Sequence, residues 1–152
     1  MQHTNQNQNV EQSYRTMGII WFALLNSQLL LLVVLYFAKP KVFEFDFSKP
    51  LLDENALFII IIGVAGIFNF IISLSLRKKF IDRAIAEQNV GLVQTAMIIG
   101  CALCEAISLF GLVLAFAQNY QYFFLWFALG ILGIILHFPR RENLIAASYR
   151  NR

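Results

Sequence analysis

Charged side chains are scarce in this chain: Asp, Glu, Lys and Arg make up 14% of its 152 residues, whereas about 25% is usual in a soluble domain. Two cysteines are too few for a disulfide-rich secreted module. Hydrophobic residues reach 59%, which excludes a disordered chain and an ordinary water-soluble enzyme. The composition therefore indicates an integral membrane protein, and we expect no soluble catalytic domain outside the bilayer.

Four long apolar runs account for this composition. Backbone groups in hydrocarbon need hydrogen-bond partners within the span, and the runs lack the period-two alternation of a membrane barrel, so we expect helices. Three of the runs reach the roughly 20 residues that cross a bilayer, and the last run is shorter. The sequence predicts an all-α, polytopic membrane protein with one four-helix transmembrane domain over residues 17–139. Its four transmembrane helices form two antiparallel hairpins, at about residues 17–38, 56–76, 92–117 and 122–138.

The segments that flank the domain indicate its orientation. Residues 1–16 are rich in Asn and Gln, which predicts a flexible polar tail, and residues 140–152 form a basic tail. The tails and the second loop carry nine Lys and Arg residues, whereas the first loop carries three. This asymmetry predicts that both termini are cytoplasmic, in a membrane that we expect to be a bacterial inner membrane. The net charge of +3 therefore reflects orientation, and we expect no nucleic-acid partner.

The first two loops also carry patterns. In residues 42–48 phenylalanine alternates with acidic residues or Ser, which is a strand period. Such a strand would add to the sheet of another protein, or its phenylalanines would lie in the membrane interface. In residues 77–89 apolar residues recur at helical spacing, so the second span is expected to continue as a helix beyond the membrane.

Glu105 is the one Asp, Glu, Lys or Arg residue inside the four runs. It lies about thirteen residues from each end of its run, roughly 20 Å deep at 1.5 Å per residue. An ionised carboxylate there costs about 2.5–3.5 kcal/mol on insertion scales, so we expect the carboxyl to be neutral. Two explanations remain open: a neutral acid that hydrogen-bonds neighbouring helices, or a carrier of protons or cations.

Polar and small residues accompany Glu105. Helical spacing places Cys101 and Ser108 on its stripe, beside a face of small residues that permits close helix approach (Gly100, Cys104, Ser108 and Gly111). Asn26 and Asn69 lie at similar depths and are expected to bond to each other, whereas Gln28 is the expected partner of Glu105. The candidate polar site therefore comprises Glu105, Ser108, Cys101, Gln28, Asn26 and Asn69.

The residues needed for enzymatic chemistry are not evident. Glu105 has no second acid, base or metal ligand near it in the pattern. Cys101 and Cys104 form a single C-x-x-C pair, for which packing in a buried helix is the simpler interpretation. His137 is expected at the membrane interface. We therefore assign no catalytic residue, no metal and no cofactor, and an enzyme is the less favoured class.

One helix carries a resemblance to a known family. Residues 104–116 read CEAISLFGLVLAF. Over about residues 96–117 this helix resembles the carboxyl-terminal helix of subunit c of F-type ATP synthases, the rotor-ring proteolipid, whose pattern is E-A-x-x-[IL]-[YF]-G-L-V-x-A. The resemblance implies that Glu105 occupies the position at which that family exchanges a proton or sodium ion.

The sequence leaves three functions open. The first is a small accessory or structural subunit of a larger membrane complex, in which Glu105 links helices. The second is a subunit that translocates protons or sodium ions, with Glu105 as the carrier. The third is a site for a small molecule or lipid between the helices. We expect the lipid bilayer and other membrane protein subunits as partners, with a homo-oligomer as another arrangement.

Overall fold

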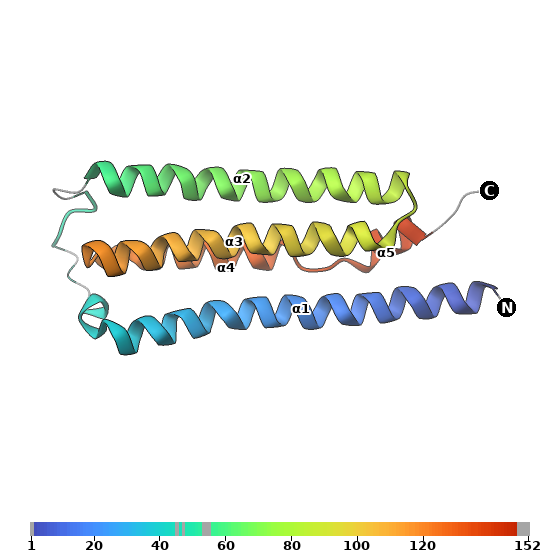
Figure 1. Ribbon diagram of the computed structural model, residues 1–152, viewed down its shortest axis with the longest axis horizontal. Coiled ribbons are helices and arrows are strands. Elements are labelled where there is room, and N and C mark those ends of the chain that lie inside the picture. The colour runs from blue at the N-terminus through green and yellow to red at the C-terminus, as the bar shows by residue number, and fades with distance from the viewer. Residues whose placement is uncertain (1, 45, 47, 53–55, 149–152) are drawn as a thin grey trace.

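The computed structural model describes residues 2–44, 46, 48–52 and 56–148, and those residues form helices, turns and loops without a strand. The elements are α1 (Gln2–Ala38), the 3-10 helix η1 (Pro40–Phe43), α2 (Ala56–Ala86), α3 (Val90–Gln118), the 3-10 helix η2 (Gln121–Phe123), α4 (Phe124–Leu136) and α5 (Arg141–Ser148). The prediction of an all-α chain is confirmed for these residues (Figure 1).

Three helices are long and apolar enough to cross a membrane: Val10–Ala38, Ala56–Ala86 and Val90–Gln118. A fourth span is counted if Gln121–Leu136 and Arg141–Ser148, which are bent by 44° relative to each other, are taken as one. The membrane prediction is thus supported by length and composition. α2 continues as a helix to Ala86, so the predicted extension beyond the apolar run is confirmed.

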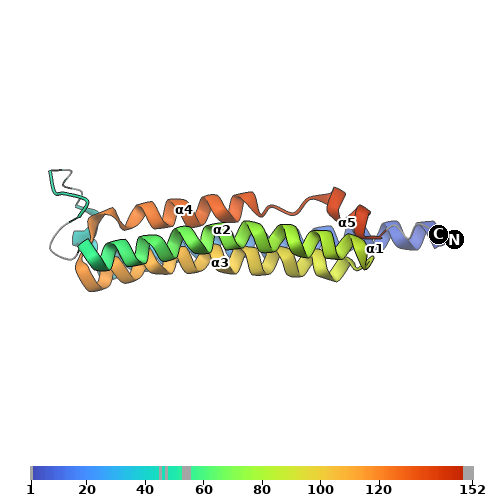
Figure 2. The same cartoon turned by 90° about the horizontal axis from the view of Figure 1, so that it is seen from above.

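α3 lies at the centre of the bundle, with α1 and α2 on opposite sides of it and α4 packed along it (Figures 1 and 2). In the most apolar 18-residue segment of each helix, 44% of α3 is buried, compared with 11% of α1 and 17% of α2. α1 and α2 therefore do not pack together as a hairpin, although they follow each other in sequence. Among helices that follow each other in the chain, α2 packs closely against α3, and α3 packs closely against α4.

Small residues bring α3 and α4 into close contact. A Cβ atom added to Gly130 would lie 2.8 Å from the Cys104 carbonyl oxygen and would overlap the Ser108 hydroxyl. One added to Gly133 would overlap the Cys104 sulfur, and one added to Gly111 would lie 2.9 Å from a backbone oxygen of η2. The predicted small-residue face of α3 is therefore the α4 contact surface, as expected for closely packed membrane helices.

The end of the bundle that holds both termini contains more helix than the sequence predicts. α1 begins at Gln2, where a flexible tail over residues 1–16 was expected, and part of the expected basic tail forms α5. The reason is shared burial: Val10 of α1 and Leu144 and Ala147 of α5 belong to one buried cluster. Apolar residues within polar segments thus extend the helical core past the apolar runs.

The first loop differs from the strand prediction. Pro40–Phe43 forms a 3-10 turn, because the fixed φ of Pro40 suits the start of a helical turn. The Phe43 ring packs edge-on against Phe123, with ring centroids 5.1 Å apart. The alternation at Phe45 and Phe47 lies outside the described residues.

Candidate functional site

Glu105 contacts α1 through Ser27. The Ser27 hydroxyl is hydrogen-bonded to Oε1 of Glu105 and also lies 2.7 Å from the Leu24 carbonyl oxygen. A hydroxyl has one proton, so Ser27 either shares it between the Leu24 carbonyl and Glu105, or donates it to Leu24 and accepts a hydrogen bond from a protonated Glu105. The second arrangement is that of a neutral carboxyl, and either one joins α3 to α1.

Gln28 and Ser108 lie within about one helical turn of this contact along their helices. Both side chains are 0% exposed. Neither the Gln28 amide nor the Ser108 hydroxyl has a hydrogen-bond partner among the described residues. The expected bond between Glu105 and Gln28 is therefore not formed, and Ser27 takes that place. Two buried polar groups remain unsatisfied at this depth, which is costly unless a water or an ion bonds to them.

The two asparagines are not brought together. The Asn26 amide donates to the Phe22 carbonyl of its own helix at 2.9 Å. Asn69 lies on α2, on the other side of α3 (Figure 1). The expected bond between Asn26 and Asn69 is therefore wrong, because similar depth does not make two helices neighbours.

Asn69 lies at the level of Glu105 instead. Two contacts fix this register between antiparallel α2 and α3. Cys104 Sγ lies 3.6 Å from Ser73 Oγ, and a Cβ added to Gly66 would lie 3.7 Å from Ile107. The Asn69 side chain is partly exposed and makes no hydrogen bond within the described part of the chain.

The cysteines and His137 form a separate buried group nearer the charged end. Cys101 and Cys104 are free and buried, and Cys104 Sγ lies 4.0 Å from His137 Nδ1. The His137 nitrogens face two carbonyl oxygens, Nδ1 that of Gly133 at 2.7 Å and Nε2 that of Ser73 at 3.3 Å. His137 is 0% exposed, so its ring is buried within the bundle, whereas its expected position at the depth of the membrane interface stays a prediction.

The His137 ring is buried because it packs on Gly100, where any Cβ atom would overlap it. Across the described residues, no group of three His, Cys, Asp or Glu side chains is placed to hold a metal ion. We therefore interpret Cys101, Cys104 and His137 as residues that pack α2, α3 and α4 together.

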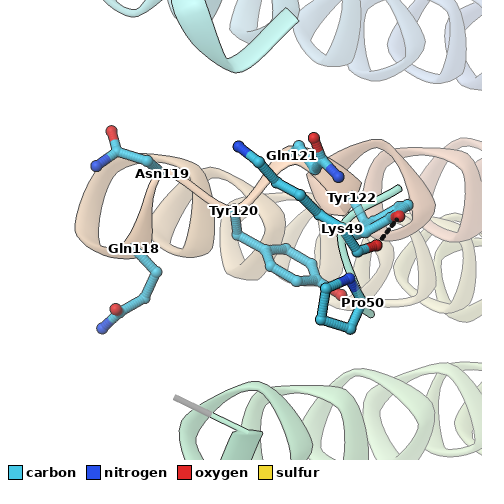
Figure 3. A pocket seen from close by; sticks show the side chains of 7 residues that line it. All are labelled: Lys49, Pro50, Gln118, Asn119, Tyr120, Gln121 and Tyr122. Atoms are coloured by element: carbon cyan, nitrogen blue, oxygen red, sulfur yellow. Dashed lines mark hydrogen bonds between the residues drawn. The ribbon is translucent and has the colours of Figure 1, made fainter. Parts of the chain in front are cut away.

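A cavity of about 300 Å³, drawn in Figure 3, has its lining residues at the opposite end of the bundle, and Glu105 is not among them. It is lined by Lys49, Pro50, Gln118, Asn119, Tyr120, Gln121 and Tyr122. The Tyr122 hydroxyl donates to the Lys49 carbonyl at 2.7 Å, and the Tyr120 hydroxyl donates to the Leu51 carbonyl at 3.1 Å. These bonds hold the first loop against the connection between α3 and α4.

The loop has a further polar anchor beside this cavity. The Gln121 amide donates to the Asp46 carbonyl at 2.6 Å and accepts from the Asp46 N–H at 3.1 Å. The Asp46 carboxylate accepts hydrogen bonds from the Ser48 hydroxyl and the Ser48 N–H, and these bonds hold the pKa of Asp46 below its ordinary value.

Two residues of the polar sites were not singled out by sequence patterns. Ser27 adjoins Asn26 and Gln28 at the right depth, but depth alone does not show which of three successive side chains faces α3. Arg77 was counted only as an orientation signal. In the structure its guanidinium donates to the carbonyls of Leu136 and Phe138.

No family model, no curated protein and no solved structure matches the chain. The likeness of residues 96–117 to the helix of ATP synthase subunit c therefore stays a prediction, and the functional argument depends on the geometry.

Proposed function

We propose that the protein is a small accessory or structural subunit of a larger membrane complex. In this proposal it is a four-span bundle with both termini cytoplasmic, in a bacterial inner membrane, and the neutral Glu105 carboxyl links α1 to α3. The single observation that carries the proposal is the side chain of Asn69.

Asn69 presents an amide at the depth of Glu105 on one of the outer helices. An amide in hydrocarbon without hydrogen bonds costs several kcal/mol, roughly 2–7 depending on the reference state. Asn69 finds no side-chain partner within the described part of the chain, and it is partly exposed. A polar group of a neighbouring subunit, either a second copy or another protein, would satisfy it.

The proposal is tested by extracting the full chain from its native membrane into nanodiscs, in the wild-type form and as Asn69→Leu. We expect the wild type to co-purify with other subunits or with itself, and Asn69→Leu to lose that association. Asn26→Leu is the matched control. It also removes a side-chain amide from a span, but the Asn26 amide already donates to a carbonyl of its own helix and needs no partner subunit. Asn26→Leu is expected to retain the association.

Two results would overturn the proposal. A monodisperse wild-type monomer without a co-purifying protein would show that no subunit is needed. Equal association of the wild type and Asn69→Leu would show that the amide does not contact a partner.

A second candidate function is favoured by the unsatisfied groups near Glu105. We infer that Glu105 is the carrier of protons or sodium ions in this second candidate. The Gln28 amide and the Ser108 hydroxyl, about one helical turn away, would then bind a water molecule or an ion beside Glu105. Their complete burial without a partner in the described chain supports this candidate.

Glu105→Gln separates the two candidates. An amide can donate to Ser27 as a neutral carboxyl does, so a structural role tolerates Gln, whereas a carrier of protons needs the acid. Proteoliposomes with a pH-sensitive dye inside would show a proton flux in the wild type and none in Glu105→Gln. A hydrophobic carbodiimide should label wild-type Glu105, and the absence of both labelling and flux would reject the carrier.

A further inference from the structure

A second polar site lies at the charged end of the bundle, where the apolar part of α2 ends. An open cavity of about 250 Å³ is lined by Arg77, Lys78, Ile81, Asp82, Arg140 and Asn143. These residues come from α2, from the segment that follows α4 and from α5. They are distinct from the Glu105 layer and from the cavity at the opposite end.

Arg77 is held in place by the end of α4. Because α4 stops at Leu136 and Pro139 follows shortly after, the last carbonyls of that helix lack helical partners. The Arg77 guanidinium donates to the carbonyl of Leu136 and, at 3.1 Å, to that of Phe138. A guanidinium has further N–H groups beyond these two bonds, so a fixed cation with donors to spare lines the cavity.

The charges around this cavity are not balanced. Its three cations and one carboxylate have a net formal charge of +2, and Arg140 lies close enough to Arg77 to repel it. Nearby cations have carboxylate partners, since Arg83 pairs with Glu87 and Arg141 pairs with Glu11. Within the described residues, no ion pair neutralises Arg77, Lys78 or Arg140.

The cavity lies where the apolar run of α2 ends, which is the place where lipid headgroups are expected. Arg77 directly follows the apolar run that ends at Leu76, and Ile81 adds an apolar wall. A basic pocket between helices at the membrane surface is a recognised way to bind anionic headgroups. We propose that this cavity binds a phosphate group through Arg77, Lys78 and Arg140, and that the phosphate belongs either to an anionic phospholipid or to a soluble anion.

The test uses the full chain in nanodiscs of phosphatidylcholine, with or without phosphatidylglycerol, and native mass spectrometry to count the lipids that stay bound. Lys78→Gln combined with Arg140→Gln removes two exposed cations and leaves the structural Arg77 intact. A hydrogen bond between a cavity cation and the phosphate contributes about 10-fold or more in affinity, so the double variant should retain phosphatidylglycerol roughly 100-fold less well than the wild type.

Lys79→Gln combined with Arg83→Gln is the matched control, because it removes two cations of α2 that do not line the cavity. The Arg83–Glu87 pair is exposed and contributes little to stability. The control should retain phosphatidylglycerol as the wild type does. An equal loss in the control would overturn the proposal, since it would show general attraction to the membrane surface.

Calorimetric titration of the detergent-solubilised chain with inorganic phosphate separates the two sources. Retention of phosphatidylglycerol over phosphatidylcholine, lost in Lys78→Gln/Arg140→Gln, identifies a lipid headgroup. Phosphate binding that the same variant loses, without any lipid preference, identifies a soluble anion. If wild type and variant behave alike in both measurements, the cavity binds no phosphate and the proposal is rejected.

Discussion

Ser27 of α1 and Glu105 of α3 meet at the partly buried interface between these helices, and their hydrogen bond joins the central helix to α1. Of the three long helices, α1 has the smallest buried share in its most apolar window. α1 packs on α3 and more weakly on the shorter α4. Because lipid competes with side chains for apolar contacts, a polar bond at this interface has more influence on helix position than one more leucine would.

The Ser27–Glu105 bond predicts a specific pattern of stability. Glu105→Ala should lower the free energy of unfolding in bicelles by about 0.6–2 kcal/mol, the range of such bonds between membrane helices. Ser27→Ala should have a similar effect, and Glu105→Gln should cost less because its amide can still donate to Ser27. In a double-mutant cycle, Ser27→Ala combined with Glu105→Ala should cost less than the two single losses added together; strict additivity would show that the residues do not interact.

The close contact between α3 and α4 predicts that Gly130 does not tolerate a methyl group. In Gly130→Ala the new Cβ would lie 2.8 Å from the Cys104 carbonyl oxygen, a backbone atom that cannot rotate away. We expect the free energy of unfolding to fall by about 1–3 kcal/mol, as overpacking costs. Gly18→Ala is the control, since nothing lies within 4 Å of its Cβ. A Gly130→Ala protein as stable as Gly18→Ala would contradict the packing.

Sequence patterns predicted the helices of the fold but not all of their neighbours. Hydropathy determines which segments enter the membrane, and the small residues around Cys104 and Ser108 correctly indicated a close contact surface on α3. Hydropathy does not distinguish a bundle in which α1 contacts α2 from one in which α3 separates them. The expected Asn26–Asn69 bond was wrong for this reason. The expected Gln28–Glu105 bond was wrong although α1 and α3 are neighbours, because rotation about the helix axis places Ser27 rather than Gln28 against Glu105.

The charged end shows a second limit of sequence patterns. Val10 is an isolated apolar residue among polar ones, and Leu144 begins a short apolar stretch after charged residues; both become core because α1 and α5 meet there. His137 likewise looks like an interfacial residue in sequence, but Gly100 opposite it leaves room for the ring in the interior. Both features depend on contacts between segments far apart in the chain.

The turn at Asp46 predicts a measurable pH dependence. Ser48 donates to the Asp46 carboxylate through its hydroxyl at 2.6 Å and through its N–H at 3.1 Å, and these bonds lower the pKa of Asp46 below 3.8. A lowered pKa in the folded protein means that the bonds stabilise the turn above the unfolded pKa, and that this stabilisation is lost as the pH falls through the folded pKa.

The titration of Asp46 can be followed by NMR of carboxyl-labelled protein. Its midpoint should lie below 3.8 in the wild type and should rise in Ser48→Ala, which removes the largest cause of the shift. The N–H of residue 48 still donates in that variant, so the midpoint should rise only part of the way. A midpoint that Ser48→Ala does not change would contradict the hydrogen-bonded turn.

The connection between α3 and α4 depends on the backbone of Asn119, which ends α3 in the left-handed region at φ 50°. Its side chain accepts a hydrogen bond from Lys39 at 2.8 Å. Asn119→Gly and Asn119→Val both remove this acceptor, but only Gly adopts the left-handed conformation without strain. Measured by unfolding in bicelles, Asn119→Val should therefore be less stable than Asn119→Gly by about 1–2 kcal/mol. Equal stabilities would mean that the chain reaches α4 through a different turn, because the backbone strain separates these two variants while the lost Lys39 contact is common to both.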